Sequence, residues 1–540
     1  MSDHRVVAEQ WLAAEPDLDV KRELQILLDG DESELAERFS SRLTFGTAGL
    51  RAAIGAGPSR MNRLVVRRAA AGLVDHLLAT VPGAAERGLL IACDARFKSA
   101  DFARDTARVA AARGMKAHLI DGMTPTPVLA WNIPRLAVAA AVMVTASHNP
   151  RGDNGYKVYL GHGAQIVPPD DTAIAARMDA IDATTVALAD DDDALIDVIG
   201  DEATRAYLAW VPSVRLAPGA TGARVGYTAM HGVGGSVLLR AFEMSALPEP
   251  AVVTLQQEPD PNFPTVEFPN PEEPGAMDLV IDLGRNEGLD VVIANDPDAD
   301  RLGVAIPSGT SGAWRLLRGD EIGWLLADHI LRRTHGDDRL VETTVVSSSL
   351  LGKMAAAHGV QYRETFTGFK WIADAAMKAH GLRLVFAYEQ ALGFLVSDRP
   401  LDKDGIAAAV LVAEIAGVAA DEGTTIEGRL DSIAATFGRH VTAERSVKMD
   451  PSVGARLVQT LTDAPPSSIG GRPVVAVRNF PEANLVRLWL SEQDGRGVRL
   501  QIRPSGTEPK VKLYGEGVEV TASELDRLLE ALVDVAVGLV

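Results

Sequence analysis

A serine that could act as a nucleophile stands in a short polar segment, Thr145-Ala-Ser-His-Asn-Pro150. The apolar run Ala137 to Val144 precedes this segment and predicts a buried strand. The hydroxyl of Ser147 would then lie on a turn at the sheet edge, where open α/β sheets bind ligands. A serine needs a base or a metal to react, and His148 and Lys157 are close in sequence. The alternative is an ordinary turn, since Ser, Asn and Pro are common turn residues.

Three aspartates stand at every second position of another short loop, Asp296-Pro-Asp-Ala-Asp300, after the apolar run Val291 to Ala294. Carboxylate oxygens at this spacing can converge on one divalent cation. An EF-hand loop that began at Asp296 would need Gly at its sixth position and Glu at its twelfth, where Arg301 and Pro307 stand. An EF-hand is thus excluded, and a metal loop or a solvated acidic turn remains.

A third polar segment, Arg503-Pro-Ser-Gly-Thr507, has the composition of a phosphate-binding loop. It combines a guanidinium fork, two hydroxyls and a glycine that lets the backbone approach a ligand closely. The alternative is a Pro-Gly turn between two strands, with Arg503 exposed to solvent.

Taken together and in this order, these segments and Phe45-Gly-Thr-Ala-Gly-Leu-Arg51 resemble the α-D-phosphohexomutase superfamily of phosphoglucomutases and phosphomannomutases. The matching motifs extend from Phe45 to Tyr514, so the resemblance covers nearly the whole chain. One hexapeptide would be a weak signal, whereas several motifs in the family's order are a specific one.

The resemblance implies an enzyme that interconverts hexose 1-phosphate and hexose 6-phosphate, with glucose or mannose as the sugar. A phosphoserine at Ser147 would donate and recover the phosphoryl group, and a hexose 1,6-bisphosphate would be the intermediate and activator. It also implies a Mg²⁺ site and a set of catalytic side chains. The implied metal ligands are Ser147, Asp296, Asp298 and Asp300, and the implied catalytic residues are Ser147, His148, Lys157, Arg301 and Lys403.

Substrate binding is implied for residues in several other motifs, with departures from the family pattern. The implied substrate-binding residues are Arg51, Thr367, Gly368, Lys370, Glu389, Arg503, Ser505, Gly506 and Thr507. The most similar subgroup has a second glutamate where this chain has Gln390, and other branches have Ser and His in place of Ala391 and Phe394. The sugar hydroxyls that Glu389 would bind are therefore left open.

Three other functions remain as alternatives. One is a phosphopentomutase of the same family. Another is a phosphatase or mutase of the haloacid-dehalogenase type, with Asp296 as an aspartyl-phosphate nucleophile, although this leaves the Ser147 and Arg503 segments unexplained. The third is a sugar-phosphate sensor without turnover, which would be expected to lack the nucleophile or a metal carboxylate. Which of the candidate side chains transfers protons, and the number of subunits, also remain open.

The elements that must position these residues follow an α/β pattern. Apolar runs alternate with amphipathic stretches from Leu43 onward, which predicts mostly parallel sheets covered by helices. Apolar strands lead to Ser147, to Asp296 and to Glu389, so we expect three related α/β domains with mixed or parallel sheets. Strands near 474–477, 485–490 and 498–502, followed by a helix, predict a C-terminal α+β domain. We expect the four domains to surround one central cleft.

Length and composition agree with several domains. A chain of 540 residues is too long for a single core. We predict a helical N-terminal extension (1–40), domains with the phosphoserine loop (41–205), the metal loop (206–312) and the sugar-binding loop (313–440), and a phosphate-binding domain (441–540).

The charge of the chain bears on its partners. A net charge of −20 argues against nucleic acid and anionic membranes as partners but is compatible with a phosphosugar held in a local basic pocket. The single cysteine, Cys93, follows apolar residues, and we expect it in a core. The sequence has neither an export signal nor a membrane-spanning run, which makes the cytoplasm the expected location.

Overall fold

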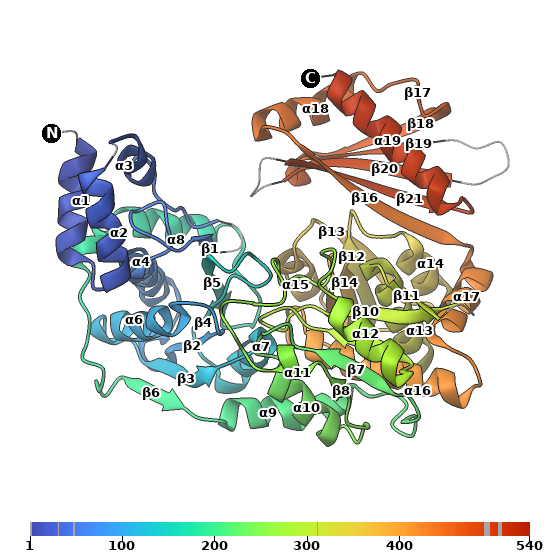
Figure 1. Ribbon diagram of the computed structural model, residues 1–540, viewed down its shortest axis with the longest axis horizontal. Helices are drawn as coiled ribbons and strands as arrows, with labels where there is room; N and C mark the ends of the chain where they lie inside the picture. The colour runs from blue at the N-terminus through green and yellow to red at the C-terminus, as the bar shows by residue number, and fades with distance from the viewer. Residues whose placement is uncertain are drawn as a thin grey trace. The chain divides into compact units, whose positions relative to one another are not determined.

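The computed structural model describes residues 3–30, 32–46, 49–309, 312–490, 497–505 and 510–539. The chain forms three α/β sheets followed by an antiparallel C-terminal sheet, which confirms the predicted fold class (Figure 1). These parts gather into two compact units. Unit 1 comprises Met1–Leu317, Ala373–Lys378 and Leu392–Gly423, and unit 2 comprises Arg318–Ile372, Ala379–Ala391 and Thr424–Val540.

The first forty residues contain three helices. They are α1 (Asp3–Ala14), α2 (Leu18–Asp29) and α3 (Glu32–Phe39). Helix α2 begins where the Asp17 carboxylate accepts hydrogen bonds from the next backbone N–H groups, and it buries Leu24 and Leu28 on one face. Trp11 packs edge-on against Phe39, with ring centroids 6.0 Å apart. These apolar residues join the core of the first sheet, so the extension is part of that domain.

The first sheet has the strand order β1-β5-β4-β2-β3-β6. Its strands are β1 (Leu50–Ala53), β2 (Leu89–Cys93), β3 (Ala117–Met123), β4 (Ala140–Val144), β5 (Asp153–Leu160) and β6 (Ile196–Ile199). Its helices are α4 (Arg63–Thr80), α5 (Ala84–Arg87), α6 (Ser99–Ala112), α7 (Thr126–Leu136), α8 (Asp170–Asp179) and the 3-10 turn η1 (Ala183–Thr185). Strands β2, β3, β4 and β6 are parallel, and β5 pairs antiparallel with β4.

One expected strand is shorter than the sequence suggested. We predicted a strand from Ala137, but Ala137 adopts a left-handed conformation with φ 53° that ends helix α7, and β4 begins at Ala140. An apolar run does not by itself distinguish a helix terminus from a strand. In the structure Ala137 is exposed, and burial begins at Val138. All five residues of β4 are buried, as are those of β2.

The second sheet repeats this arrangement, with order β11-β10-β9-β7-β8. Its strands are β7 (Val225–Thr228), β8 (Ala251–Val252), β9 (Val291–Ala294), β10 (Gly303–Ser308) and β11 (Ala313–Leu316). Its helices are α9 (Glu202–Trp210), η2 (Val211–Val214), α10 (Gly235–Met244), α11 (Thr254–Gln257) and α12 (Asp278–Glu287), and α16 (Gly405–Asp421) packs against α10 and β9. In both sheets, the candidate loop joins a buried parallel strand to an antiparallel one, β4 to β5 and β9 to β10.

The third α/β segment contains the parallel strands β13, β12 and β14 in that order. Its elements are α13 (Gly319–Arg333), β12 (Arg339–Thr344), α14 (Leu350–Ala357), β13 (Gln361–Thr365), α15 (Phe369–Met377), β14 (Arg383–Glu389), β15 (Gly393–Leu395) and α17 (Ile426–Phe437). Strand β14 continues to Glu389, so this residue ends a strand.

The C-terminal sheet has the order β16-β21-β20-β19-β18-β17, and its register is antiparallel throughout. Its elements are β16 (His440–Lys448), α18 (Pro451–Asp463), β17 (Ser468–Ile469), β18 (Arg472–Phe480), η3 (Pro481–Ala483), β19 (Leu485–Leu490), β20 (Gly497–Pro504), β21 (Lys510–Val518) and α19 (Ala522–Gly538). Residues of α18, α19 and the strands form a separate apolar core.

The predicted boundaries fall at different kinds of places. Residue 205 lies within α9, residue 312 lies between β10 and β11, and residue 440 begins β16. The four-domain division at these residues stays a prediction.

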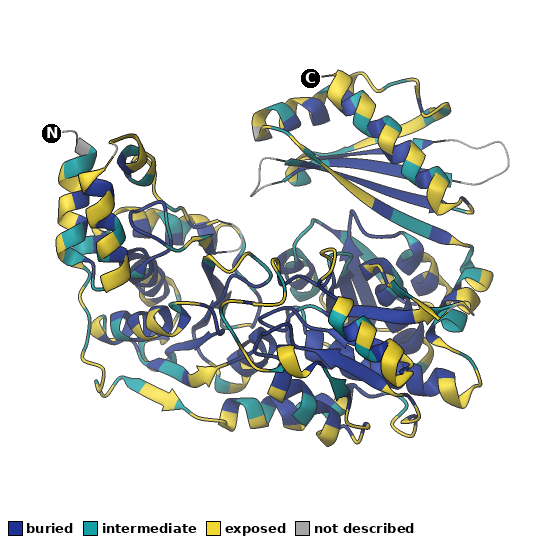
Figure 2. Ribbon diagram, viewed as in Figure 1, coloured by how far each residue is buried: buried dark blue, intermediate teal, exposed yellow. Residues whose placement is uncertain are grey.

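Burial follows the expected layering, with central strands buried and outer helix faces exposed (Figure 2). Cys93 lies in the first core, and burial raises the pKa of its thiol to about 12. In the described part of the chain, every helix is too short or too polar to cross a bilayer.

Candidate active site

The turn after β4 holds Ser147 in a strained conformation. Its φ is 53°, in the left-handed region that non-glycine residues rarely adopt. Its backbone N–H donates to Thr145 Oγ1 at 2.8 Å. Its side-chain hydroxyl donates to Asp296 Oδ2 at 2.7 Å and lies 3.3 Å from His148 Nδ1. The structure therefore brings together a serine, a histidine and an aspartate that sequence analysis selected separately.

The aspartate loop after β9 is held in place by hydrogen bonds to its backbone carbonyls. Carbonyl groups of the loop accept hydrogen bonds from three other segments: Pro297 O from Val233 N, Asp298 O from Thr126 N and Ala299 O from Gly405 N. Ala299 also has a positive φ, 57°. The loop is thus fixed to elements far apart in sequence, all within unit 1.

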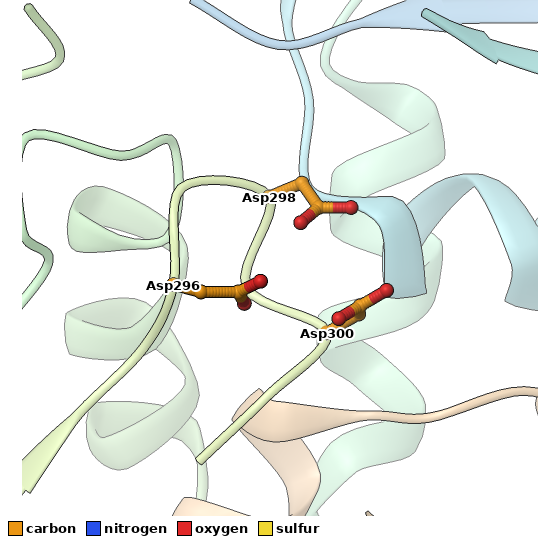
Figure 3. A group of neighbouring side chains, drawn as sticks. All are labelled: Asp296, Asp298 and Asp300. Carbon is orange, nitrogen blue, oxygen red and sulfur yellow. The ribbon is translucent and has the colours of Figure 1, made fainter. Parts of the chain in front are cut away.

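The three carboxylates of this loop converge (Figure 3). One oxygen from each of Asp296, Asp298 and Asp300 lies within 4.8 Å of the others, and all three side chains are buried. Burial, reinforced by the charges of Asp298 and Asp300, raises the pKa of Asp296 to about 8. Such a cluster is costly without a cation, because like charges out of water repel strongly.

Two features of the cluster fit a divalent metal ion. Oδ1 of Asp298 and Oδ1 of Asp300 are buried and accept no hydrogen bond from the described residues. Buried carboxylate oxygens are otherwise satisfied, so these atoms are available as ligands. An all-oxygen donor set on a short loop suits Mg²⁺. The residues present therefore fit the implied metal.

Two lysines pair with the same carboxylates. Lys157 Nζ donates to Asp298 Oδ2 at 2.7 Å and to Asp300 Oδ2 at 2.8 Å. Lys403 Nζ lies 3.3 Å from Asp300 Oδ2. Burial raises the pKa of Asp300, but the charges of Lys157 and Lys403 outweigh it and hold that pKa far below its ordinary value. Burial lowers the pKa of Lys157, but the two carboxylates outweigh it and keep the pKa above its ordinary value.

The Lys403 segment is held rigidly. Asp402 Oδ2 accepts hydrogen bonds from Tyr159 and Gln165, both at 2.7 Å. Asp404 caps helix α16 by accepting from two backbone N–H groups, and it also accepts from Tyr207. These bonds place Lys403 beside Asp300 although the two residues are far apart in sequence.

Two arginines lie around the serine. Arg51 Nη1 donates to Asn149 Oδ1 at 2.8 Å. The Arg301 backbone N–H donates to Asp296 Oδ1 at 3.0 Å, and its Nε lies 4.0 Å from Asp296 Oδ2. Burial, followed by the charges of Arg301 and Arg51, lowers the pKa of His148 well below its ordinary value. The imidazole beside Ser147 is therefore neutral near pH 7.

The predicted sugar-binding residues lie in unit 2, at the C-terminal end of β14 and at the start of α15. Glu389 Oε1 accepts a hydrogen bond from Gly368 N at 2.8 Å, which joins the two segments. Thr367 Oγ1 is buried and makes no hydrogen bond with the described residues. Lys370 is buried, and its Nζ lies 5.1 Å from the Trp371 ring centroid. Gln390 Oε1 accepts from Ser347 Oγ at 3.1 Å.

The predicted phosphate loop is described only in part. Arg503 ends strand β20 opposite Lys512, and Ser505 N donates to Lys510 O at 2.8 Å. Burial raises the pKa of Tyr514, and a hydrogen bond with Arg503 opposes this rise. Gly506 and Thr507 lie outside the described residues.

Comparison with known proteins decides the family. Models of four phosphoglucomutase/phosphomannomutase domains match the chain in order: α/β/α domains I, II and III at residues 42–185, 207–309 and 318–437, and the C-terminal domain at residues 488–535. The chain belongs to this family.

Members of the phosphoglucomutase/phosphomannomutase family are phosphotransferase enzymes, and so is this chain. A probable phosphomannomutase of Haemophilus influenzae is 40% identical over 474 residues, 87% of this chain and 95% of the relative. A human phosphopentomutase is 33% identical over 555 residues, 94% of this chain and 90% of the relative. A solved structure of a family protein from Burkholderia thailandensis is 19% identical with a TM-score of 0.68 over 91% of this chain and 95% of that one, which supports the fold.

Sequence analysis of this phosphotransferase missed several residues that support the site. Arg96 and Asp94 contact the Ser147 turn, Thr126 Oγ1 donates to Asp298 Oδ2 at 2.6 Å, and Tyr159 holds the Lys403 segment. One signal was available, because Asp94 to Ser99 is a polar segment directly after the buried strand β2. The Ser147 and Asp296 loops also follow buried strands directly.

Proposed function

We propose that the protein is a phosphosugar mutase that interconverts the 1-phosphate and 6-phosphate of glucose or mannose, with Ser147 as the phosphoryl carrier. The observation that carries this proposal is the 2.7 Å contact between the Ser147 hydroxyl and Asp296, at the edge of three converging carboxylates. A hydroxyl in a strained turn beside a candidate metal cluster is arranged for phosphoryl transfer.

In the proposed reaction, phosphorylated Ser147 transfers its phosphoryl group to the free hydroxyl of the substrate. The bond from phosphorus to the serine oxygen breaks, a bond from phosphorus to the sugar oxygen forms, and the sugar hydroxyl gives its proton to a base. The resulting hexose 1,6-bisphosphate then turns over, and Ser147 takes the other phosphoryl group. Positioning and charge neutralisation supply most of the acceleration in such transfers.

A Mg²⁺ ion, when bound, would be held by Asp296, Asp298, Asp300 and an oxygen on Ser147, and it would neutralise phosphoryl charge. The chain itself provides further positive charge on both sides of the serine. Arg301 is bonded to Asp296 through its backbone, and Arg51 is bonded to Asn149. We assign to both guanidinium groups the binding of phosphoryl oxygens, for which their planar geometry is suited.

The proton carriers are drawn from His148, Lys157 and Lys403. The neutral imidazole of His148 lies 3.3 Å from the Ser147 oxygen and can accept a proton. Both lysines are paired with metal-loop carboxylates, and this pairing keeps the pKa of Lys157 above its ordinary value. We therefore assign proton acceptance to His148 and charge stabilisation to the lysines.

We assign sugar and phosphate binding to residues of unit 2. The hydrogen bond from Gly368 to Glu389 and the buried Thr367 hydroxyl support a sugar-binding role for these loops. For Arg503, Ser505, Gly506 and Thr507, the support is the composition of the segment and the family match. The second carboxylate oxygen of Glu389 and the Lys370 ammonium add hydrogen-bonding capacity for hydroxyls.

A phosphopentomutase is the second candidate, because a phosphopentomutase is among the relatives with similar coverage. Glucose and mannose phosphates differ at one stereocentre, whereas ribose phosphate is smaller by one carbon. Selection among glucose, mannose and ribose phosphates would depend on hydrogen bonds around Glu389 and on the volume of the sugar site.

The test is turnover with Mg²⁺ and a trace of hexose 1,6-bisphosphate. Glucose, mannose and ribose 1-phosphates are compared in parallel, with Ser147→Ala as the inactive control. We expect the conversion of at least one hexose 1-phosphate into its 6-phosphate. Preferential conversion of ribose 1-phosphate would favour the second candidate. Release of inorganic phosphate, or binding without conversion, would rule out both.

A further inference from the structure

The Ser147 turn is wrapped around a buried arginine that belongs to neither the metal site nor the predicted substrate-binding set. We propose that Arg96 is a positioning residue that holds the turn in its reactive shape, an inference that rests on the proposed role of Ser147. Arg96 lies directly after β2 and is 3% exposed.

The guanidinium group of Arg96 donates to four backbone carbonyls of the turn. Nη1 donates to Pro150 O at 2.8 Å and to Asp153 O at 3.2 Å. Nη2 donates to Ser147 O at 2.6 Å and to Asn149 O at 2.5 Å. The carbonyls of Ser147, Asn149 and Pro150 lie between β4 and β5, and Asp153 is the first residue of β5. One planar group thus sets the path of the whole turn.

The carboxylate of Asp94, at the end of β2, connects Thr145 at the start of the turn to the same segment as Arg96. Asp94 Oδ2 lies 3.5 Å from Arg96 Nε and accepts a hydrogen bond from Thr145 Oγ1 at 2.6 Å. Thr145 Oγ1 in turn accepts from the Ser147 N–H at 2.8 Å. Asp94 Oδ1 is occupied by the hydroxyl of Ser99 at 2.7 Å. Both the N–H and the C=O of Ser147 are therefore connected to the polar segment after β2.

The guanidinium group also lies over an aromatic ring of the second α/β domain within unit 1. The Arg96 Cζ lies 5.1 Å from the centroid of the Phe263 ring, which is 3% exposed. An arginine between a ring and a set of carbonyls has little freedom to move. Arg96 is thus fixed on one side by Phe263 and on the other by the turn that it holds.

Such a support is needed because Ser147 adopts an unfavourable conformation. A serine with φ 53° persists only when its surroundings impose that conformation. Without Arg96, four carbonyls would lose charged donors and the turn could relax. The distance from the Ser147 hydroxyl to Asp296 would then no longer be fixed. A lysine would keep the charge but has one compact ammonium, which does not span four carbonyls.

A second buried arginine in unit 1 offers a matched control. Arg215 donates to the carbonyls of Ser245, Ala217 and Ala220 and pairs with Glu414 at 2.9 Å. Arg215 donates to three backbone carbonyls, against four for Arg96, and each arginine has one carboxylate partner. None of the partners of Arg215 belongs to the candidate site. Loss of Arg215 should lower stability as the loss of Arg96 does, without changing the Ser147 turn.

The experiment compares Arg96→Met, Arg96→Lys and Arg215→Met in the full chain. The measurements are kcat and KM for the converted sugar 1-phosphate, the denaturation midpoint, and amide hydrogen exchange of the peptide containing Ser147. We expect kcat to fall on the order of 100-fold in Arg96→Met and about 10-fold in Arg96→Lys, with KM changed by less than about threefold. Arg215→Met should keep kcat within about threefold per folded molecule. Exchange at the Ser147 peptide should accelerate only in the Arg96 variants.

The outcomes separate the two proposals. Equal losses of kcat in Arg96→Met and Arg215→Met, with equal exchange at the Ser147 peptide, would show that Arg96 supports only the fold. If Arg96→Met does not fold, Arg96→Lys decides the question by the same comparison. If the wild type converts no sugar phosphate, the proposed function fails. The exchange measurement then decides alone whether Arg96 holds the turn.

Discussion

Two turns at strand ends are built in the same way, one in each unit. The Ser147 turn follows the buried parallel strand β4, and the turn Val345–Ser349 follows the buried parallel strand β12. In both turns, buried arginines donate to backbone carbonyls of the turn. The two turns differ in where the arginines come from.

Arg96 belongs to the same sheet as the turn it holds, whereas the second turn is held by the C-terminal sheet. Arg487 of β19 donates to Val345 O, and Arg499 of β20 donates to Ser347 O, both at 2.5 Å. Ser347 Oγ then donates to Gln390, which follows Glu389. The nucleophile turn is therefore held by an arginine from its own sheet domain, whereas the sugar loop depends on arginines of the C-terminal sheet.

A carboxylate strengthens this dependence. Glu516 of β21 accepts hydrogen bonds from Ser348 Oγ at 2.6 Å and from Ser349 N at 2.8 Å, and it pairs with Arg499 at 2.9 Å. His440 Nδ1 lies 3.0 Å from the same carboxylate. Changes in unit 1 should therefore affect phosphoryl transfer, and changes at the C-terminal sheet should affect sugar binding.

The largest expected effect is the loss of a metal-loop carboxylate. In Asp298→Asn, kcat should fall on the order of 1,000-fold. The variant loses one carboxylate ligand of the proposed Mg²⁺ ion, and this ion would neutralise the negative charge of the transferring phosphoryl group. The Mg²⁺ concentration for half-maximal rate should rise. The control is Asp105→Asn, which removes a buried carboxylate paired with Arg63 and Arg67 in the same unit. A similar loss of kcat in both variants would contradict the metal assignment.

A smaller effect of a different kind is expected from Arg499→Met. KM for the sugar phosphate should rise about 10-fold and kcat should fall less, because the Ser347 turn and Gln390 lose their support. The matched control is Arg339→Met, since Arg339 of unit 2 is also buried and bonded to carbonyls, those of Gly336, Leu331, Thr334 and His358. If steady-state kinetics show that Arg499→Met lowers kcat and leaves KM unchanged, the distinction between the Ser147 turn and the Ser347 turn is wrong.

The Glu516 network predicts a pH dependence of stability. Burial raises the pKa of Glu516, but Arg499, His440 and Ser348 outweigh it and lower the pKa from 4.5 to about 2. A lowered pKa in the folded state stabilises the fold above pH 4.5, and this stabilisation is lost as the pH falls toward 2. The shift corresponds to about 3 kcal/mol.

Urea denaturation from pH 6 to pH 3 measures this contribution as the difference between the wild type and Glu516→Gln. The difference should shrink as the pH falls through this window. Glu444→Gln serves as the control, because Glu444 pairs with Lys512 in a partly exposed ion pair of small expected energy. If the difference in unfolding free energy between the wild type and Glu516→Gln stays constant over the whole pH range, the ionised form of Glu516 does not stabilise the fold.

The smallest effect is expected from Gln390→Glu, which introduces the glutamate that the family resemblance led us to expect there. Ser347 and Thr344 hydroxyls donate to Gln390 Oε1, and a carboxylate oxygen accepts such bonds equally well. KM should change by less than about threefold, whereas Gln390→Met should change it more. Equal effects of both variants on KM would show that the acceptor is not what positions Glu389.

How much the sequence predicted depends on how local the signal was. Strands at 89–93 and 291–294 and the loops that follow β4 and β9 were predictable, because strand periodicity and turn residues are adjacent in the chain. The start of β4 was not, because the apolar run continues through Ala137. Arg96 was not identified either, since its partners lie about fifty residues further along.

Pairings between distant segments set the remaining limit. The contact between Lys403 and Asp300 joins residues about a hundred positions apart, and nothing in either segment specifies the other. The family resemblance supplied these residues, whereas periodicity and spacing did not. The supporting arginines were missed because a buried arginine has the same sequence signature as an exposed one.

The most direct test of the central claim is to identify the residue that carries the phosphoryl group. The protein is incubated with Mg²⁺ and hexose 1,6-bisphosphate, and the phosphorylated site is mapped by mass spectrometry after alkaline treatment. Our account predicts a base-stable phosphate on Ser147 that is lost when sugar 1-phosphate is added and is absent from Ser147→Ala. A base-labile phosphate on Asp296, or a sugar-phosphate exchange that persists in Ser147→Ala, would contradict it.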